Sequence, residues 1–135
     1  MPSNQDVALA VKRLQWRHHR ETNRRLSAQV GVSLVQWDVL RRIHHSPDLS
    51  LHALAEATFQ TDQSMGELAK RMIERGLIER VDGGGRAVRH RLTAAGVSAF
   101  QAGSGVLDEV LQDTVGRLSA KERTALFDLL EKASG

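Results

Sequence analysis

The basic side chains of this chain are concentrated in one stretch, from Lys70 to Arg91. That stretch holds seven lysines and arginines against three acids, a surplus of four, whereas the whole 135-residue chain carries a formal net charge of only +3. Clustered lysines and arginines attract phosphate groups, and every nucleotide of a nucleic acid carries one. The chemistry indicated first is therefore polyanion binding, and a solvated charged face is the alternative explanation of such a cluster.

The sequence contains few of the residue patterns that are typical of enzyme active sites. The chain has no cysteine, which excludes disulfides, cysteine-based zinc fingers and thiol redox sensing. Its glycine run, Gly83-Gly84-Gly85, falls at the tip of a predicted hairpin rather than before a helix, so it is a weak candidate for cradling phosphate. No nucleophile elbow, P-loop or dinucleotide fingerprint occurs in the sequence. We therefore predict that the protein is not an enzyme and uses no cofactor.

The histidines are the candidate metal ligands. They are His18, His19, His44, His45, His52 and His90. No two of them are four residues apart, and metal sites need imidazoles and carboxylates that converge in space. His18 could meet His44 or His45 between two helices, but surface or hydrogen-bonded core histidines are the simpler interpretation. We predict no metal site.

The stretch from Ser50 to Thr93 is predicted to hold the basic residues on a helix and a hairpin. Thr61 or Asp62 caps a helix that ends at Gly76. Its apolar residues fall at helical spacing, at Met65, Leu68, Met72 and Ile73. A shorter helix, capped by Ser50, precedes it. Together they predict a helix-turn-helix.

A hairpin follows the second of these helices. Strands over 77–81 and 87–92 flank the turn Asp82-Gly83-Gly84-Gly85, which glycines make easily. A helix-turn-helix followed by a basic hairpin is the layout of a winged-helix DNA binder, in which the second helix enters the major groove.

Further helices flank this stretch. The first, capped by Ser3 or Asn4, is predicted to end at Gly31, and a capping box at Ser33 opens a helix to about His45. Thr93 caps a long helix in which Gly103-Ser104-Gly105 predicts a kink or a close approach by a neighbour, since glycine costs roughly 1 kcal/mol in a helix interior. Ser119 opens a last helix.

The terminal helices carry wide apolar faces that a domain of this size cannot bury, which favours a dimer interface.

The predicted fold is mainly α with a small β-hairpin wing. Residues 1–135 form one domain, with a winged helix-turn-helix lobe over 33–93 and dimerisation helices over 1–32 and 94–135. No apolar signal segment and no run of ~20 apolar residues occurs, so we expect a cytoplasmic protein with no membrane partner.

The order of helices and hairpin resembles the MarR family of bacterial transcription regulators. The resemblance covers nearly the whole chain, and its most specific parts are Gly76-Leu77-Ile78-Glu79-Arg80 and the L-T-x-x-G junction at 92–96. It implies a homodimer joined through its terminal helices, with the recognition helix in the major groove and the wing in the minor groove of double-stranded DNA. It further implies a repressor that binds a pseudo-palindromic operator and is released by a small aromatic or organic-anion effector. A winged-helix module that binds another protein is the alternative function.

The resemblance and the charge pattern together nominate site residues. The predicted DNA contacts are Thr61, Gln63, Ser64, Glu67, Lys70, Arg71, Arg86, Arg89 and Arg91. The predicted effector pocket is lined by Trp16, Arg17, His18, Trp37 and Arg41, with a core position as the alternative for Trp37. The chain departs from the family pattern at Gly84, where the wing motif D-x-R has its aspartate, and at Gly66-Glu67, where a Thr-Arg pair is common.

Overall fold

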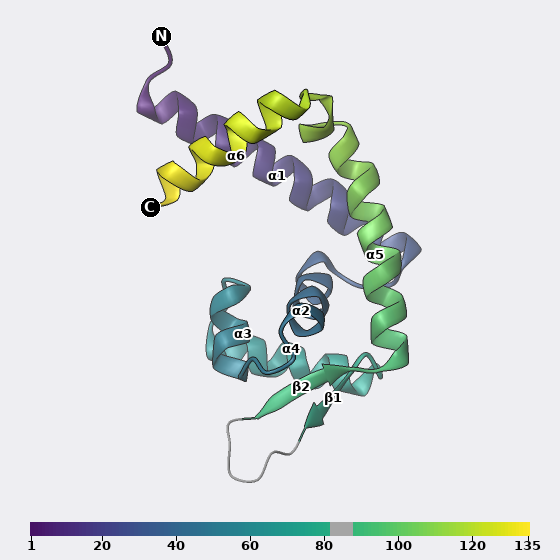
Figure 1. The fold of residues 1–135 in the computed structure, drawn as a ribbon. Coiled ribbons are helices and arrows are strands. Elements are labelled where there is room, and N and C mark those ends of the chain that lie inside the picture. Colours follow the sequence, from purple (N-terminus) through teal and green to yellow (C-terminus); the bar gives the residue numbers. More distant parts are fainter. Residues whose placement is uncertain (82–87) are drawn as a thin grey trace.

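The computed structural model describes residues 1–81 and 88–135. Its elements follow one another in chain order, as Figure 1 shows. They are α1 (Asn4–Gln29), α2 (Leu34–His45), α3 (Leu51–Ala57), α4 (Asp62–Glu74), β1 (Ile78–Val81), β2 (Arg89–Leu92), α5 (Ala94–Gln112), the 3-10 turn η1 (Val115–Arg117) and α6 (Ala120–Ser134). The predicted fold class is confirmed.

Each α-helix of the described chain begins at a serine or threonine. In every case the side-chain oxygen of that residue accepts a hydrogen bond from the backbone N–H three residues later, which satisfies one of the amides that a helix start leaves unpaired. The capping residues are Ser3, Ser33, Ser50, Thr61, Thr93 and Ser119. The predicted helix starts are therefore confirmed, and Ser3 and Thr61 prove to be the caps where two candidates were open.

The hydrophobic core lies where α2, α3, α4 and β1 meet. Its fully buried side chains include Leu40, Leu54, Met65 and Met72. The core also takes in a residue of α1 and one of α5, so it extends beyond both ends of the predicted lobe over 33–93. The terminal helices are therefore not separate from the lobe, because their inner ends help to build its core.

One residue of the predicted apolar face of α4 lies outside the core. Ile73 is 39% exposed, while Ala69 is buried on the inner face of α4. Sequence spacing gives the direction of a face to within one residue, and small residues such as alanine occupy the tightest point of a helix contact. Met65 and Met72 are buried as predicted, and Leu68 is partly buried against the core.

The hairpin pairs β1 with β2 antiparallel, with Ile78 opposite Leu92 and Val81 opposite Arg89. Thr93 fastens its base, since the threonine hydroxyl donates to the carbonyl oxygen of Gly76 at 2.6 Å. The structure therefore confirms the predicted wing strands, each shortened at one end.

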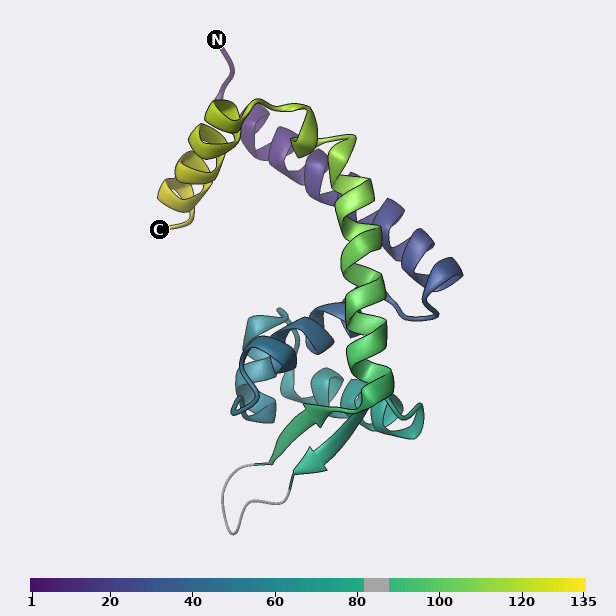
Figure 2. The same cartoon turned by 45° about the vertical axis from the view of Figure 1, so that its right-hand side comes forward.

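Helix α5 runs unbroken past the Gly103-Ser104-Gly105 segment, and of the two predicted alternatives the close approach by a neighbour is confirmed. A Cβ on Gly103 would lie 2.2 Å from Cδ1 of Trp37. The Trp37 indole N–H donates to the carbonyl oxygen of Phe100 at 3.0 Å, and the two rings stack with centroids 5.9 Å apart. Figure 2 shows α5 as a long helix that runs from the hairpin, past α1, to the segment that leads into α6.

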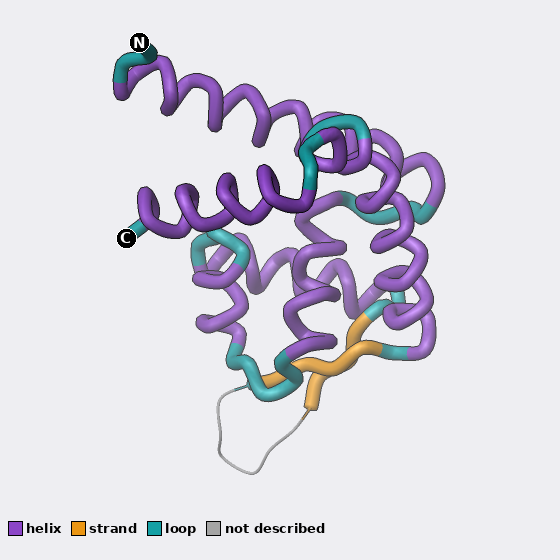
Figure 3. The backbone as a smooth tube through the Cα atoms, turned by 45° about the horizontal axis from the view of Figure 1, so that its top comes forward, coloured by secondary structure: helices purple, strands orange, loops and turns teal. Residues whose placement is uncertain are grey.

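Helices α1 and α6 lie on the side of the molecule away from the hairpin, as Figure 1 shows, and Figure 3 shows the N- and C-terminal ends on the same side. Helix α6 has no buried residue, and the outer part of α1 exposes Val7 and Val11. No described helix is both long and apolar enough to cross a membrane.

The close packing of the Trp37 ring against α5 can be tested by substituting two nearby glycines of that helix. Gly103→Ala should lower the free energy of unfolding by about 1–3 kcal/mol, because the new methyl group overlaps the indole. Gly105→Ala should raise it by about 0.5–1 kcal/mol, because nothing lies within 4 Å of its Cβ position and alanine favours the helix. Urea unfolding of the two variants measures both changes, and equal effects would contradict the packing described.

Candidate nucleic-acid interface

Helix α4 presents a continuous polar face to solvent. The exposed side chains recur at spacings of three and four residues, opposite the buried face of Met65, Ala69 and Met72. They are Gln63, Ser64, Glu67, Lys70, Arg71 and Glu74. Every predicted contact residue of this helix therefore lies on one accessible face, together with Thr61, whose hydroxyl oxygen caps the helix by accepting from the Ser64 N–H at 3.1 Å.

Lys70 and Arg71 are the cations of this face. Both are exposed, and neither has an ion-pair partner in the described part of the chain. A lysine or arginine that is not engaged by a carboxylate of its own protein is available to neutralise a phosphate. The acids Glu67 and Glu74 lie on the same face, so α4 has no net positive charge along this surface.

The arginines of β2, both predicted DNA contacts, form ion pairs within the protein. Arg89 is largely buried and its Nη1 donates to Oδ1 of Asp48 at 3.0 Å. Arg91 pairs across the hairpin with Glu79, its partner in the strand register. Arg89 also pairs through its backbone with Ser50, so it ties the end of β2 farthest from the base of the hairpin to the segment before α3.

Arg75, which follows α4, is also engaged. Its Nη2 donates to the carbonyl oxygen of Gly31 at 2.5 Å and its Nη1 to Oε1 of Gln36 at 3.2 Å. Gly31 lies in the turn between α1 and α2, in the left-handed conformation at φ +79°. Sequence reasoning missed this contact, because its partners are about forty residues apart.

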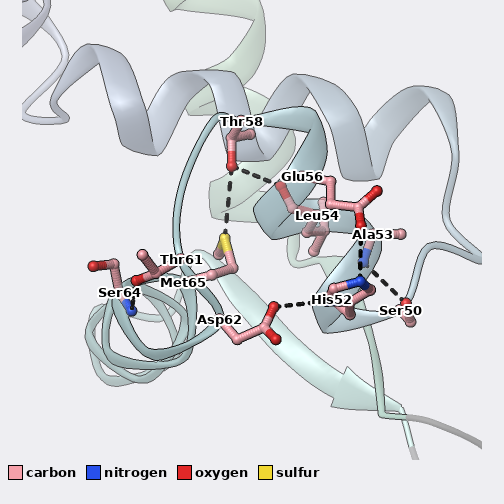
Figure 4. A network of polar contacts seen from close by, with 10 residues as sticks. All are labelled: Ser50, His52, Ala53, Leu54, Glu56, Thr58, Thr61, Asp62, Ser64 and Met65. Atoms are coloured by element: carbon pink, nitrogen blue, oxygen red, sulfur yellow. Dashed lines mark hydrogen bonds and ion pairs between the residues drawn. The ribbon is translucent and has the colours of Figure 1, made fainter.

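The turn between α3 and α4 is held by its own side chains, as Figure 4 shows. Thr58 is buried, and its hydroxyl donates to the carbonyl oxygen of Leu54 at 2.6 Å. Phe59 next to it has φ +57° and a side chain that is 95% exposed, an uncommon combination for a residue other than glycine. The helix-turn-helix geometry is therefore set by local hydrogen bonds as well as by the core.

The predicted wing contact Arg86, with Asp82 and Gly84 of the wing motif, lies outside the described residues. It remains a prediction.

The predicted effector residues fall into two groups. Trp16 and Arg17 line an open cleft of about 540 Å³ between α1 and α5, and His18 Nε2 shares a hydrogen bond with Oγ1 of Thr114 on the wall of that cleft, at 2.6 Å. Trp37 lies in the core, and Arg41 pairs with Asp38 and covers the outer side of the Trp37 ring. The prediction of one pocket lined by all five residues is therefore wrong for the single chain.

The cleft between α1 and α5 is rich in arginine. Arg24 and Arg25 both donate to Glu21 and lower the pKa of that carboxyl to about 2. Arg17 and Arg20 line the same cleft without an ion-pair partner among the described residues. Burial, followed by the nearby charge of Arg17, lowers the pKa of His18. The cleft therefore favours an anion that brings an apolar surface for Trp16.

The histidines are spread over several elements of the fold. His44 and His45 pack against Phe100, His90 is buried in the hairpin, and its pKa is lowered by burial and by Arg80. Nowhere in residues 1–81 and 88–135 do three or more histidines and acids form a group that could hold a metal ion.

The comparisons with known proteins agree on one family. The sequence model of the MarR family matches residues 30–87. The transcriptional regulator HosA of Escherichia coli O127:H6 is 33% identical over 99 residues, which are 72% of this chain and 73% of HosA.

Solved structures share the fold at lower identity. The Mycobacterium tuberculosis MarR family protein Rv2887 in its complex with DNA is 22% identical and superposes with a TM-score of 0.76, covering 95% of this chain and 97% of that one. Its complex with salicylic acid, at 22% identity, covers 98% and 97% with a TM-score of 0.74. The extent of the match to HosA, the family model and the winged fold lead to one conclusion: this chain is a transcriptional regulator of the MarR family.

Proposed function

We propose that the protein binds double-stranded DNA as a homodimer and represses transcription from a pseudo-palindromic operator. The observation that carries this proposal is the exposed polar face of α4, which has two unengaged cations and stands beside a hairpin of fixed register. A dimer presents two such helices to half-sites about one helical turn apart. The complex of Rv2887 with DNA supports the assignment of the ligand.

Lys70 and Arg71 carry the phosphate contacts of α4 in this proposal. Gln63 and Ser64, nearer the helix start, face the bases, where amide and hydroxyl groups read the edges of the major groove. Glu67 accepts from the amino group of cytosine. Arg89 and Arg91 serve to hold the hairpin rather than to contact DNA.

Removing either α4 cation should weaken DNA binding in a salt-dependent way. For Lys70→Ala or Arg71→Ala, the slope of log affinity against log salt should fall by roughly 1.8 for the dimer, because each of the two protomers loses one phosphate contact. Gel shifts with the DNA upstream of the gene for this protein, at several salt concentrations, measure the slope. Lys132→Ala is the matched control, since it removes the same charge at the end of α6 and should leave the slope unchanged. A wild-type protein that binds this DNA without salt dependence would favour the alternative of a protein-binding module.

The homodimer is proposed to form through the terminal helices, residues 1–32 and 94–135. Helix α6 exposes Phe127, Leu129 and Leu130, and Phe127 lines an apolar cleft on that helix. A helix with an apolar face and no buried residue gains stability only from a partner. Exposed Val7 and Val11 extend this surface onto α1.

Phe127→Glu should dissociate the dimer without unfolding the lobe. A carboxylate placed in an apolar interface must be desolvated or ejected, so the dissociation constant of the dimer should rise roughly a hundredfold or more. Sedimentation velocity measures the change. Phe59→Glu is the control, because it charges another exposed phenylalanine, on the α3–α4 turn, and should leave the protein dimeric.

The effector is proposed to be a small aromatic anion that binds the cleft between α1 and α5. Trp16 offers a ring for stacking, and Arg17 and Arg20 offer charge. The complex of Rv2887 with salicylic acid supports this class of ligand. Binding releases DNA if the anion binds better to a state whose recognition helices no longer match the half-sites.

Salicylate should raise the melting temperature of the wild-type protein, since a ligand at about 100 times its dissociation constant adds about 2.7 kcal/mol. The shift should disappear in Arg17→Ala and in Arg20→Ala. Arg41→Ala is the matched control on α2 and should keep the full shift. Loss of the shift in Arg41→Ala alone would move the site to α2.

A further inference from the structure

The imidazole of His52 lies between two carboxylates that come from different helices. Its Nδ1 is 2.8 Å from Oδ1 of Asp62, the first residue of α4, and its Nε2 is 2.8 Å from Oε1 of Glu56, one turn further along α3. Figure 4 shows His52 between these two groups at the start of the recognition helix. The side chain thus joins the two helices of the helix-turn-helix on their exposed side.

This geometry requires a charged imidazole. An ionised carboxylate only accepts hydrogen bonds, and a neutral imidazole carries an N–H on one nitrogen only. Both contacts are hydrogen bonds only when both ring nitrogens are protonated. After loss of a proton, one nitrogen lone pair faces a carboxylate oxygen, and that contact becomes repulsive.

We propose that His52 is a positioning residue of the DNA interface: its imidazolium holds the first turn of α4 to α3 and offsets the charge of Asp62 and Glu56, so that DNA affinity depends on its protonation. The inference rests on the proposed DNA binding by α4. Asp62 immediately precedes Gln63 and Ser64, so the link lies next to the residues that face the bases. With His52 charged, the group has a net charge of −1; with His52 neutral it is −2, which repels phosphate more strongly.

The electrostatic surroundings favour the charged form. Hydrogen bonding to Asp62, followed by the charges of Asp62 and Glu56, raises the pKa of His52 above 6.5. These two acids, one from each helix, are the charged groups that act on the ring. Because the pKa is raised on folding, the contribution of this link to stability is complete below pH 6.5 and is lost as the pH rises through the raised value. At higher pH the link between the helices is lost and the net charge of the group changes from −1 to −2. Both changes should weaken DNA binding.

The two carboxylates approach opposite sides of the ring, so they do not converge on one point as the ligands of a metal ion do. This arrangement is a bridge between helices.

The test is the pH dependence of DNA affinity in His52→Gln, measured by fluorescence anisotropy at constant ionic strength from about pH 6 to about pH 8.5. The probe is a duplex carrying the DNA upstream of the gene for this protein. Wild type should bind roughly two- to fivefold tighter than His52→Gln at the acid end, a size typical of exposed ion pairs. This advantage should vanish at the alkaline end. His45→Gln, which alters an exposed histidine without a carboxylate partner among the described residues, should keep the wild-type profile.

A purely structural histidine would give a different result. In that case His52→Gln would bind more weakly by the same factor at every pH, and parallel profiles would overturn the inference while leaving DNA binding intact. Failure of the wild type to bind the duplex at any pH would overturn the proposed function and this inference with it. An NMR titration of the His52 ring gives a readout without DNA: its pKa should fall in Asp62→Asn, and an unchanged pKa would refute the link.

Discussion

The contact between Trp37 and Gly103 determines how the two halves of the molecule are joined. The indole lies so close to the α5 backbone that only a glycine fits beneath it, and its N–H is bonded to the carbonyl oxygen of Phe100. Helix α2 belongs to the core of the lobe, and α5 leads to the helices proposed to form the dimer. A close-packed contact of this kind transmits displacement instead of absorbing it. The distance between two recognition helices in a dimer would therefore follow any change in the angle of α5.

The recognition helix α4 is held in place by contacts at its first turn, its middle and its end. His52 holds its first turn to α3, Met65 and Met72 bury its middle, and Arg75 ties its end to the turn between α1 and α2. The first and last of these are polar side-chain contacts on the surface, whereas the middle is apolar and buried. A helix held in this way should move as a rigid body with its surroundings. A change of pH would act on its first turn through His52, and a displacement of α1 would act on its end through Arg75. The arginine-rich cleft lies on α1, so the proposed effector would contact the helix that precedes the turn to which Arg75 ties α4.

The sequence predicted what is decided locally. Serine and threonine caps, the glycines at the ends of α1 and α4 and the hairpin strands depend on residues a few positions apart, and these predictions are confirmed. The roles of Arg89 and of Trp37 depend on Asp48 and on Gly103, which are distant in the sequence. Charge counting treats all arginines alike, so it gave no means of telling Lys70, which is unengaged, from Arg89, which is paired within the fold.

The charges left on the surface bear on how the protein would select its DNA. Once Arg75, Arg89 and Arg91 are assigned to contacts within the protein, the exposed face of α4 combines two cations with two acids. Phosphate neutralisation supplies affinity for any sequence, and each acid facing the groove reduces that affinity unless it meets a matching base. The α4 face thus adds little affinity for DNA of any sequence, and it lowers the affinity for sequences whose bases do not match its acids. A dimer compensates for weak general attraction, because two linked half-site contacts act together. On this reasoning, the proposed DNA binding would require the proposed dimer at physiological salt.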